Sequence, residues 1–260
     1  MQIYNTISNF FYPPLEIPAP IQIPGFKIVH TYPGDLDSSM VTAEFVDADT
    51  LKISFPGLSS DINFTARRQD IFASNPNNDL DIAIINAANR HLGGGGGIDG
   101  AIHSKGGASY GAGHAKLKEQ YRSQYVEGHA AMIGSGELRR KYHINNVIVV
   151  AGPQGKPTEE AQGQGQLYSC LFNSLVLAHS QGKTAVASPA ISTGIFGFPN
   201  DVAAQVFKRA VFDFYHQHPD TTVRTVSIHY LPTDPDSSLQ AYKSSNISLE
   251  NIEPIYTTDV

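Results

Sequence analysis

Four short runs of apolar residues, rich in β-branched side chains, constrain the fold of this chain more than any other feature. They lie at Asp81–Asn86, Asn146–Gly152, Lys183–Ser188 and Arg224–Tyr230. None of them alternates cleanly between apolar and polar positions, as a strand with one solvent-exposed face would. Strands that are buried on both faces have this composition, and they occur in sheets that helices cover on both sides. The runs therefore predict a mostly parallel central sheet.

Helical patterns separate these runs. The expected helices lie over Leu167–Ala178, from Asn200-Asp201 to Phe214, and from Asp99 onward, the last interrupted at Gly106-Gly107 and at Gly111–Gly113. In the first two, apolar residues recur every three or four positions, as on the buried face of a helix. The Asn200-Asp201 pair is expected to cap the second helix. Strands that alternate with helices predict an α/β fold, a three-layer α/β/α sandwich with a mixed, mostly parallel central sheet.

The first 62 residues differ from the rest and predict a β-rich N-terminal extension. Five prolines within residues 1–25 disfavour helices and central strands there. Three stretches with partial alternation then predict antiparallel strands, at Phe26–Tyr32, Val41–Asp47 and Leu51–Phe55. We expect a Pro-rich segment and short strands in 1–62, the α/β domain in 63–246, and a C-terminal tail in 247–260.

Charge and cysteine content exclude several classes of protein. The chain has 18 Lys and Arg against 24 Asp and Glu, a net charge of −6, so it lacks the basic surface of a nucleic-acid binder. A single cysteine forms no internal disulfide. No apolar run approaches the roughly 20 residues that span a bilayer, and the amino terminus lacks a basic signal-peptide region. We expect a cytoplasmic protein without a nucleic-acid or membrane partner; export by a non-classical route and the oligomeric state stay open.

Two glycine-rich loops follow two of the predicted strands. The first contains the unbroken run Gly93–Gly97 just before the helix at Asp99, and the second, Pro189–Pro199, contains Gly194 and Gly197. Ligands of parallel sheets bind beyond the carboxyl ends of the strands. A glycine run before a helix lets backbone N–H groups approach an anion. Neither loop is a P-loop or an ordered GxGxxG motif, yet both predict a polyphosphate site.

Polar side chains in these loops are candidate ligand contacts. Asn86 and Asn89 can bond ribose hydroxyls as donors and acceptors, and the Asp99 carboxylate can orient a hydroxyl or a water. A strand-end role for Asn86 and a helix-cap role for Asp99 are the alternatives. Ser192 and Thr193 lack the strand-to-helix elbow of a serine hydrolase, so their hydroxyls are expected to contact a diphosphate.

The two loops together resemble those of the macro domain family. The matching segments are NAANRHLGGGGGIDGAIH at 86–103, PAISTGIFGFP at 189–199, VIVVAGP at 147–153 and Gln69-Asp70-Ile71. The resemblance covers residues 65–245 and implies ADP-ribose as the ligand. It implies that Asp70 and Ile71 bind the adenine and that Asn89 holds the distal ribose. The diphosphate would lie between Gly94, Gly95, Gly96, Gly97 and Ile98 of the first loop and Ser192, Thr193, Gly194, Ile195, Phe196 and Gly197 of the second.

The hydrolase members of that family imply a reaction, the removal of mono-ADP-ribose from acidic side chains, and a related one, the deacetylation of O-acetyl-ADP-ribose. We expect Asn89 and Asp99 to be the catalytic residues, with Asp99 placing a water near the anomeric carbon. No cofactor or metal is expected, because the zinc-dependent branch carries Cys and His in its glycine loop and the run Gly93–Gly97 has neither. The partner is ADP-ribose or an ADP-ribosylated protein. A non-catalytic ADP-ribose reader and a phosphatase of phosphorylated ADP-ribose stay open as alternatives.

Two departures from the family pattern concern the adenine end. Gln69 replaces the usual glycine, and the segment from Asp70 to Asn86 is longer than in most members. Tyr230, at the end of the last predicted strand, is the candidate to stack on the adenine, with a core position as the alternative. Both departures are expected to reshape the adenine site without changing the chemistry.

Overall fold

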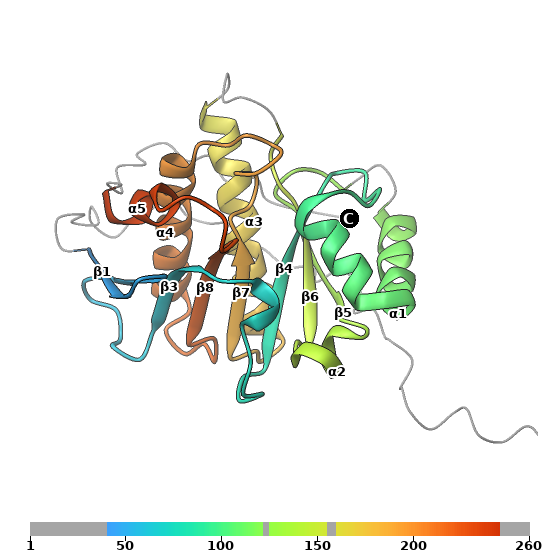
Figure 1. Ribbon diagram of the computed structural model, residues 1–260, viewed down its shortest axis with the longest axis horizontal. Coiled ribbons are helices and arrows are strands. Elements are labelled where there is room, and N and C mark those ends of the chain that lie inside the picture. The colour runs from blue at the N-terminus through green and yellow to red at the C-terminus, as the bar shows by residue number, and fades with distance from the viewer. Residues whose placement is uncertain (1–40, 122–124, 155–159, 245–260) are drawn as a thin grey trace, which may run out of the picture.

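The computed structural model describes residues 41–121, 125–154 and 160–244, which form a mixed eight-stranded sheet covered by helices (Figure 1). The strands are β1 (Thr42–Asp47), β2 (Thr50–Ser54), β3 (Asn63–Arg68), β4 (Ile82–Ala88), β5 (Ala130–Gly134), β6 (Asn146–Ala151), β7 (Ala185–Pro189) and β8 (Thr225–Tyr230). Their order across the sheet is β1-β2-β3-β8-β7-β4-β6-β5. Neighbours from β3 to β6 in this order are parallel, and the pairings at both edges are antiparallel. The expected fold class and the four buried strands are confirmed.

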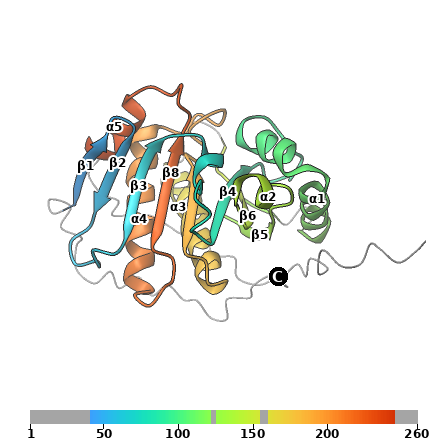
Figure 2. The ribbon, with the colours of Figure 1, turned by 60° about the horizontal axis from the view of Figure 1, so that its bottom comes forward.

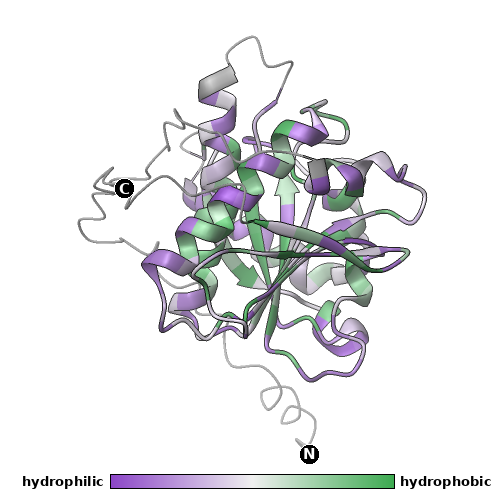
Figure 3. Cartoon of the chain, turned by 90° about the vertical axis from the view of Figure 1, so that its left-hand side faces the viewer, coloured by the Kyte–Doolittle hydropathy of each residue, from purple (hydrophilic) through white to green (hydrophobic). Residues whose placement is uncertain are grey.

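Successive residues of the central strands face two separate apolar cores. In β4, Ile82 and Ile84 pack into one core, whereas Ala83 and Ile85 pack into the other. Both faces of β4, β6 and β7 are therefore apolar, which explains why the sequence shows no polar alternation there. β8 differs, because Val226, Ile228 and Tyr230 pack into one core while Ser227 and His229 lie on its other face. In Figure 3 the central strands are mostly hydrophobic, and hydrophilic residues lie on the helices and loops around them.

The helices form the two outer layers (Figure 2). They are α1 (Gly97–Tyr121), α2 (Leu138–Tyr142), α3 (Glu160–Ser180), α4 (Asn200–Gln217) and α5 (Ser237–Ser244). α3 and α4 cover one face of the sheet, and α1 and α2 cover the other. The predicted cap of α4 is wrong, because Pro199 is the N-cap residue and no side chain caps this helix. None of the described helices is long and apolar enough to cross a bilayer.

The helix α1 is kinked where the sequence predicts an interruption. Gly107 has φ 67° and ψ −164°, a conformation that glycine adopts without the Cβ clash of other residues. The second predicted interruption, at Gly111–Gly113, is wrong, because the chain stays helical through these glycines. The kink divides α1 into two segments of different direction.

β1 and β2 continue the central sheet as its antiparallel edge. They confirm the predicted strands at Val41–Asp47 and Leu51–Phe55, and Leu51 packs into the same core as Phe64 of β3. The Pro-rich segment, the strand predicted at Phe26–Tyr32 and the tail 247–260 lie outside the described residues. Where the chain is described, the strands of the N-terminal extension therefore extend the domain's own sheet.

Candidate functional site

A pocket of about 570 Å³ lies at the carboxyl ends of the parallel strands. Each of these strands contributes to its lining, which includes Asp70 after β3, Tyr230 of β8, Pro189 of β7, Asn89 after β4 and Gly152 after β6. This is the place where open α/β sheets bind ligands. Its volume lies within the range of sites for small molecules and cofactors.

The two glycine-rich loops form facing walls of the pocket. Residues 95–98 line one wall and residues 192–196 line the other. A Cβ atom on Gly96 would lie 3.6 Å from Ile195 Cδ1, so the loops approach each other closely. Gly94 and Gly197 do not line the pocket, and their φ values of 72° and 71° shape the loops. Their predicted contact with a diphosphate stays a prediction.

Ser192 fits into space that Gly152 leaves open. A Cβ atom on Gly152 would lie 2.4 Å from Ser192 Oγ. Ser192 has φ 65°, and its buried hydroxyl has no hydrogen-bond partner among the described residues. The Thr193 hydroxyl instead donates to the carbonyl oxygen of Ala190 at 2.9 Å. Of the two hydroxyls predicted to meet a diphosphate, only that of Ser192 has its hydrogen-bonding capacity unused.

Asn86 lies behind the pocket and holds Asp99. It is fully buried and does not line the pocket. Its Nδ2 donates to Asp99 Oδ1 at 2.8 Å and to the Tyr110 hydroxyl at 2.9 Å. The structure therefore corrects the predicted ligand contact of Asn86 to a positioning role.

Asp99 presents one carboxylate oxygen that the rest of the described structure leaves unpartnered. The residue lies in the first turn of α1, where the helix dipole favours negative charge, and it is 3% exposed. Oδ1 accepts a hydrogen bond from Asn86, whereas the buried Oδ2 has no hydrogen-bond partner among the described residues. A Cβ atom on Gly95 would lie 3.6 Å from Oδ2, which places this oxygen beside the first glycine loop. Buried polar atoms without partners are rare, so Oδ2 marks where a ligand or water binds.

Asn89 lines the pocket and stabilises the first loop. Its Oδ1 accepts from the backbone N–H groups of His91 at 3.0 Å and Gly93 at 3.5 Å. The Asn89 side chain thus stabilises the backbone just before the glycine run. Its predicted contact with a ribose stays a prediction.

The opposite end of the pocket is built around a short 3-10 turn, Ile71–Ala73. Asp70 caps this turn, because its Oδ1 accepts from Phe72 N at 3.0 Å. Tyr230 lines the pocket but is only 4% exposed, so its ring belongs largely to the core. Sequence reasoning missed Phe72 and Lys105 in the lining, where the Lys105 ammonium lies 4.9 Å from the Phe72 ring centre.

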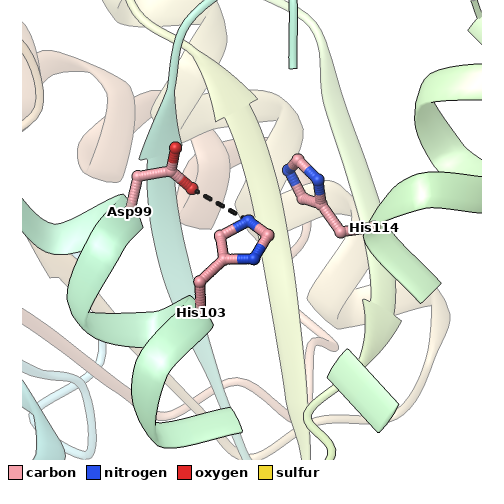
Figure 4. Close-up of side chains that lie close together, drawn as sticks. All are labelled: Asp99, His103 and His114. Atoms are coloured by element: carbon pink, nitrogen blue, oxygen red, sulfur yellow. Dashed lines mark ion pairs between the residues drawn. The ribbon is translucent and has the colours of Figure 1, made fainter. Parts of the chain in front are cut away.

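Two histidines of α1 lie beside Asp99, as Figure 4 shows. His103 Nε2 is 3.6 Å from Asp99 Oδ1, and the ring centres of His103 and His114 are 4.5 Å apart. Burial, and then the nearby His103, lower the pKa of His114 below its usual value. Neither histidine is among the site residues predicted from the sequence.

His229 is a buried neutral histidine in the pocket lining. Its Nδ1 lies 3.2 Å from the Gln69 carbonyl oxygen, which only accepts, so Nδ1 carries the proton. Nε2 then accepts from the Ser227 hydroxyl at 2.9 Å. Gln69 therefore contributes its backbone here, which makes the departure from glycine compatible with the site. Burial lowers the pKa of His229 to about 4.

We expect His229 to make the folded chain less stable as the pH falls from 6.5 towards 4. The folded-state pKa of about 4 lies below the ordinary value of 6.5, so in this window the unfolded chain binds a proton that the folded chain does not. A pKa shift of that size lowers the free energy of unfolding by on the order of 3 kcal/mol between pH 6.5 and 4. Urea unfolding at several pH values measures it for the parent chain and His229→Gln. His216→Gln, on an exposed residue, is the control; a pH dependence that His229→Gln leaves unchanged would contradict the assignment.

Comparison with known proteins identifies the family and the fold. The family model described as Macro domain matches residues 85–207, which include both glycine-rich loops. The chain is 38% identical to the O-acetyl-ADP-ribose deacetylase of Cronobacter sakazakii over 141 residues, 54% of this chain and 74% of that protein. It is also 38% identical to the ADP-ribose glycohydrolase MACROD1 of Mus musculus over 154 residues, 58% of this chain and 44% of that protein.

A solved structure shares the architecture. The Oceanobacillus iheyensis macrodomain with ADP superposes with a TM-score of 0.60 at 24% identity, covering 70% of this chain and 89% of that one. The fold, the matched segment and the 38% identity to the Cronobacter sakazakii protein, of which the chain covers 74%, agree. This chain belongs to the macro domain family.

Proposed function

We propose that this chain binds ADP-ribose in the pocket and hydrolyses mono-ADP-ribose from acidic side chains of modified proteins. The relatives named as a deacetylase and a glycohydrolase support a hydrolytic reaction. Related solved structures that contain ADP or ADP-ribose support the ligand. The observation that carries the proposal is the unpartnered Oδ2 of Asp99 at the pocket wall.

The ligand would lie along the carboxyl ends of the parallel strands, from β3 and β8 at one end of the pocket to β4 and β6 at the other. Its adenine would lie near Asp70, Ile71 and Tyr230. Its diphosphate would lie between the two loops, where backbone N–H groups precede α1 and the Ser192 hydroxyl is free to donate. Its distal ribose would then reach Asn89 and Asp99.

The proposed reaction is the displacement of the carboxylate by water at the anomeric carbon of that ribose. The water oxygen bonds to the anomeric carbon, the bond from this carbon to the carboxylate oxygen breaks, and the electron pair leaves with the carboxylate. Asp99 Oδ2 and the substrate's own phosphate accept hydrogen bonds from the water, and the proton that the water loses passes to the solvent. The pocket would contribute orientation and stabilise charge through backbone dipoles. O-acetyl-ADP-ribose carries an ester on the same ribose, so its deacetylation is a second reaction for this site.

Calorimetry with ADP-ribose, followed by a release assay, tests the proposal. We expect saturable binding of ADP-ribose and loss of label from a protein mono-ADP-ribosylated on glutamate or aspartate. Binding without release would favour a non-catalytic reader. Release of inorganic phosphate from phosphorylated ADP-ribose, without loss of protein label, would favour the phosphatase alternative. No binding of ADP-ribose would contradict all three.

A further inference from the structure

Three side chains of α1 with metal-binding atoms converge next to the pocket. Asp99, His103 and His114 each offer one such atom, and these atoms lie within 4.8 Å of one another. Figure 4 shows the two imidazoles and the carboxylate gathered around one space. This cluster is distinct from the two loops assigned above to a diphosphate.

The kink of α1 creates this cluster. Asp99 and His103 are four residues apart and share a helix face, but His114 follows His103 by 114 − 103 = 11 positions. In a straight helix that separation corresponds to about 16 Å along the axis. The observed distance between the two ring centres is 4.5 Å, because Gly107 turns the second segment of α1 back beside the first.

The imidazole nitrogens in this cluster lack partners. His103 Nε2 and His114 Nε2 are buried and make no hydrogen bond to the described residues. Asp99 and His114 are each only 3% exposed. The 3.6 Å between His103 Nε2 and Asp99 Oδ1 is too long for a hydrogen bond. Leaving a buried polar group unsatisfied costs about 1–3 kcal/mol, so two such nitrogens beside one carboxylate indicate a missing ligand.

We propose that Asp99, His103 and His114 bind one divalent transition-metal ion of the Zn²⁺ class. Two imidazole nitrogens and one carboxylate oxygen suit Zn²⁺ or Co²⁺, whereas Mg²⁺ and Ca²⁺ prefer oxygen ligands alone. A fourth position remains for water, as in open three-ligand sites. Asn86 donates to Asp99 Oδ1 and holds the carboxylate in place, as the partners of metal ligands do.

The surroundings of the cluster are consistent with a cation. The His103 side chain is 30% exposed, which gives an ion a route from solvent. The Asp99 carboxylate supplies negative charge near His114, and Lys118 supplies an opposing positive charge. Because Asp99 also lines the pocket, the ion and the pocket ligand share one side chain, and each would change the affinity of the other equally.

Titration of the metal-free chain with Zn²⁺ alone, followed by calorimetry, tests the site. We expect one Zn²⁺ per chain and no binding of Mg²⁺, and Co²⁺ should give the visible absorption of a low-coordinate nitrogen and oxygen site. His114→Phe keeps a ring in the packed position but has no ligand atom. It should weaken Zn²⁺ binding more than about tenfold, since even an outer partner of a metal ligand is worth ~10–100-fold.

His103→Gln, on the more exposed ligand, should give the same loss and decides the matter if His114→Phe does not fold. The matched control is His216→Gln, on an exposed histidine of α4, which should bind Zn²⁺ like the parent. Zn²⁺ binding that is absent, or equal in all variants, would overturn the site. Binding of ADP-ribose to His114→Phe is measured separately in chelator, so failure of the metal site and failure of the proposed function give different results.

Discussion

Replacing Asp99 by asparagine is expected to slow the release of ADP-ribose from a modified carboxylate by ~10²–10⁴-fold, the usual contribution of a positioned acid–base group. Asn86 Nδ2 donates to Oδ1 of Asp99, so the carbonyl oxygen of the new amide must face Asn86. Its NH₂ group then replaces Oδ2 beside Gly95. An NH₂ group only donates, so it cannot accept a hydrogen bond from the attacking water. Single-turnover release of label, measured in chelator, gives the rate.

Asp201→Asn is the matched control for this variant. Asp201 is also an acidic residue in the first turn of a helix, but it is exposed on α4 and does not line the pocket. It should release label at the parent rate. Calorimetry should show that Asp99→Asn still binds ADP-ribose, because the loops and the adenine end are unchanged. A parent-like release rate in Asp99→Asn would contradict the proposed role of Oδ2.

The sheet and the two loops could be predicted because each is encoded in a short segment. β4, β6 and β7 have residues in the apolar cores on both faces, so each reads as a largely continuous apolar run, whereas β8 has residues in one of these cores only. The glycine runs follow two of these strands directly, and the rule that ligands bind at the carboxyl ends of parallel strands then locates the pocket. β5 could not be found this way, because the antiparallel edge strand AAMIG is short and has a weak pattern.

The error at Asn86 has a simple physical origin. Side chains of a strand alternate between faces, so Asn86 shares the face of Ile82 and Ile84, which pack in the same core as Ile102 of α1. It therefore points at α1 and meets Asp99 and Tyr110 there. The alternation of side chains along the strand already predicts that Asn86 faces α1. Its polar side chain at the end of the strand favoured a ligand contact instead.

His114 is a different case, because no local pattern places it beside His103. Helical spacing brings together residues three or four apart, and these two are joined only by the reversal at Gly107. The glycine pair predicts an interruption but not the direction of the chain beyond it. That direction depends on packing against the turn at residues 135–137, whose Glu137 N donates to Gly106 O at 3.0 Å.

Substituting alanine for Gly136 is expected to cost about 2–5 kcal/mol of folding free energy, from a left-handed backbone and from overpacking. Gly136 has φ 59°, and an added Cβ would lie 2.3 Å from the Gly106 carbonyl oxygen and 2.7 Å from Tyr110 N. Both are backbone atoms, so no side-chain rotation relieves the contact. The turn must separate from the α1 kink, which also loosens the hold on Tyr110 and His114. Urea unfolding gives the free energy, and hydrogen exchange should show faster opening near residues 106–110.

Gly182→Ala separates the two contributions. Gly182 has nearly the same φ, 63°, but an added Cβ there meets nothing within 4 Å. Only the backbone penalty should remain, about 1–2 kcal/mol, with no change in exchange near the kink. The difference between the two variants then measures the contact between the turn and α1. Equal losses in both would mean that the turn does not brace the kink, and that the position of His114 depends on the helix itself.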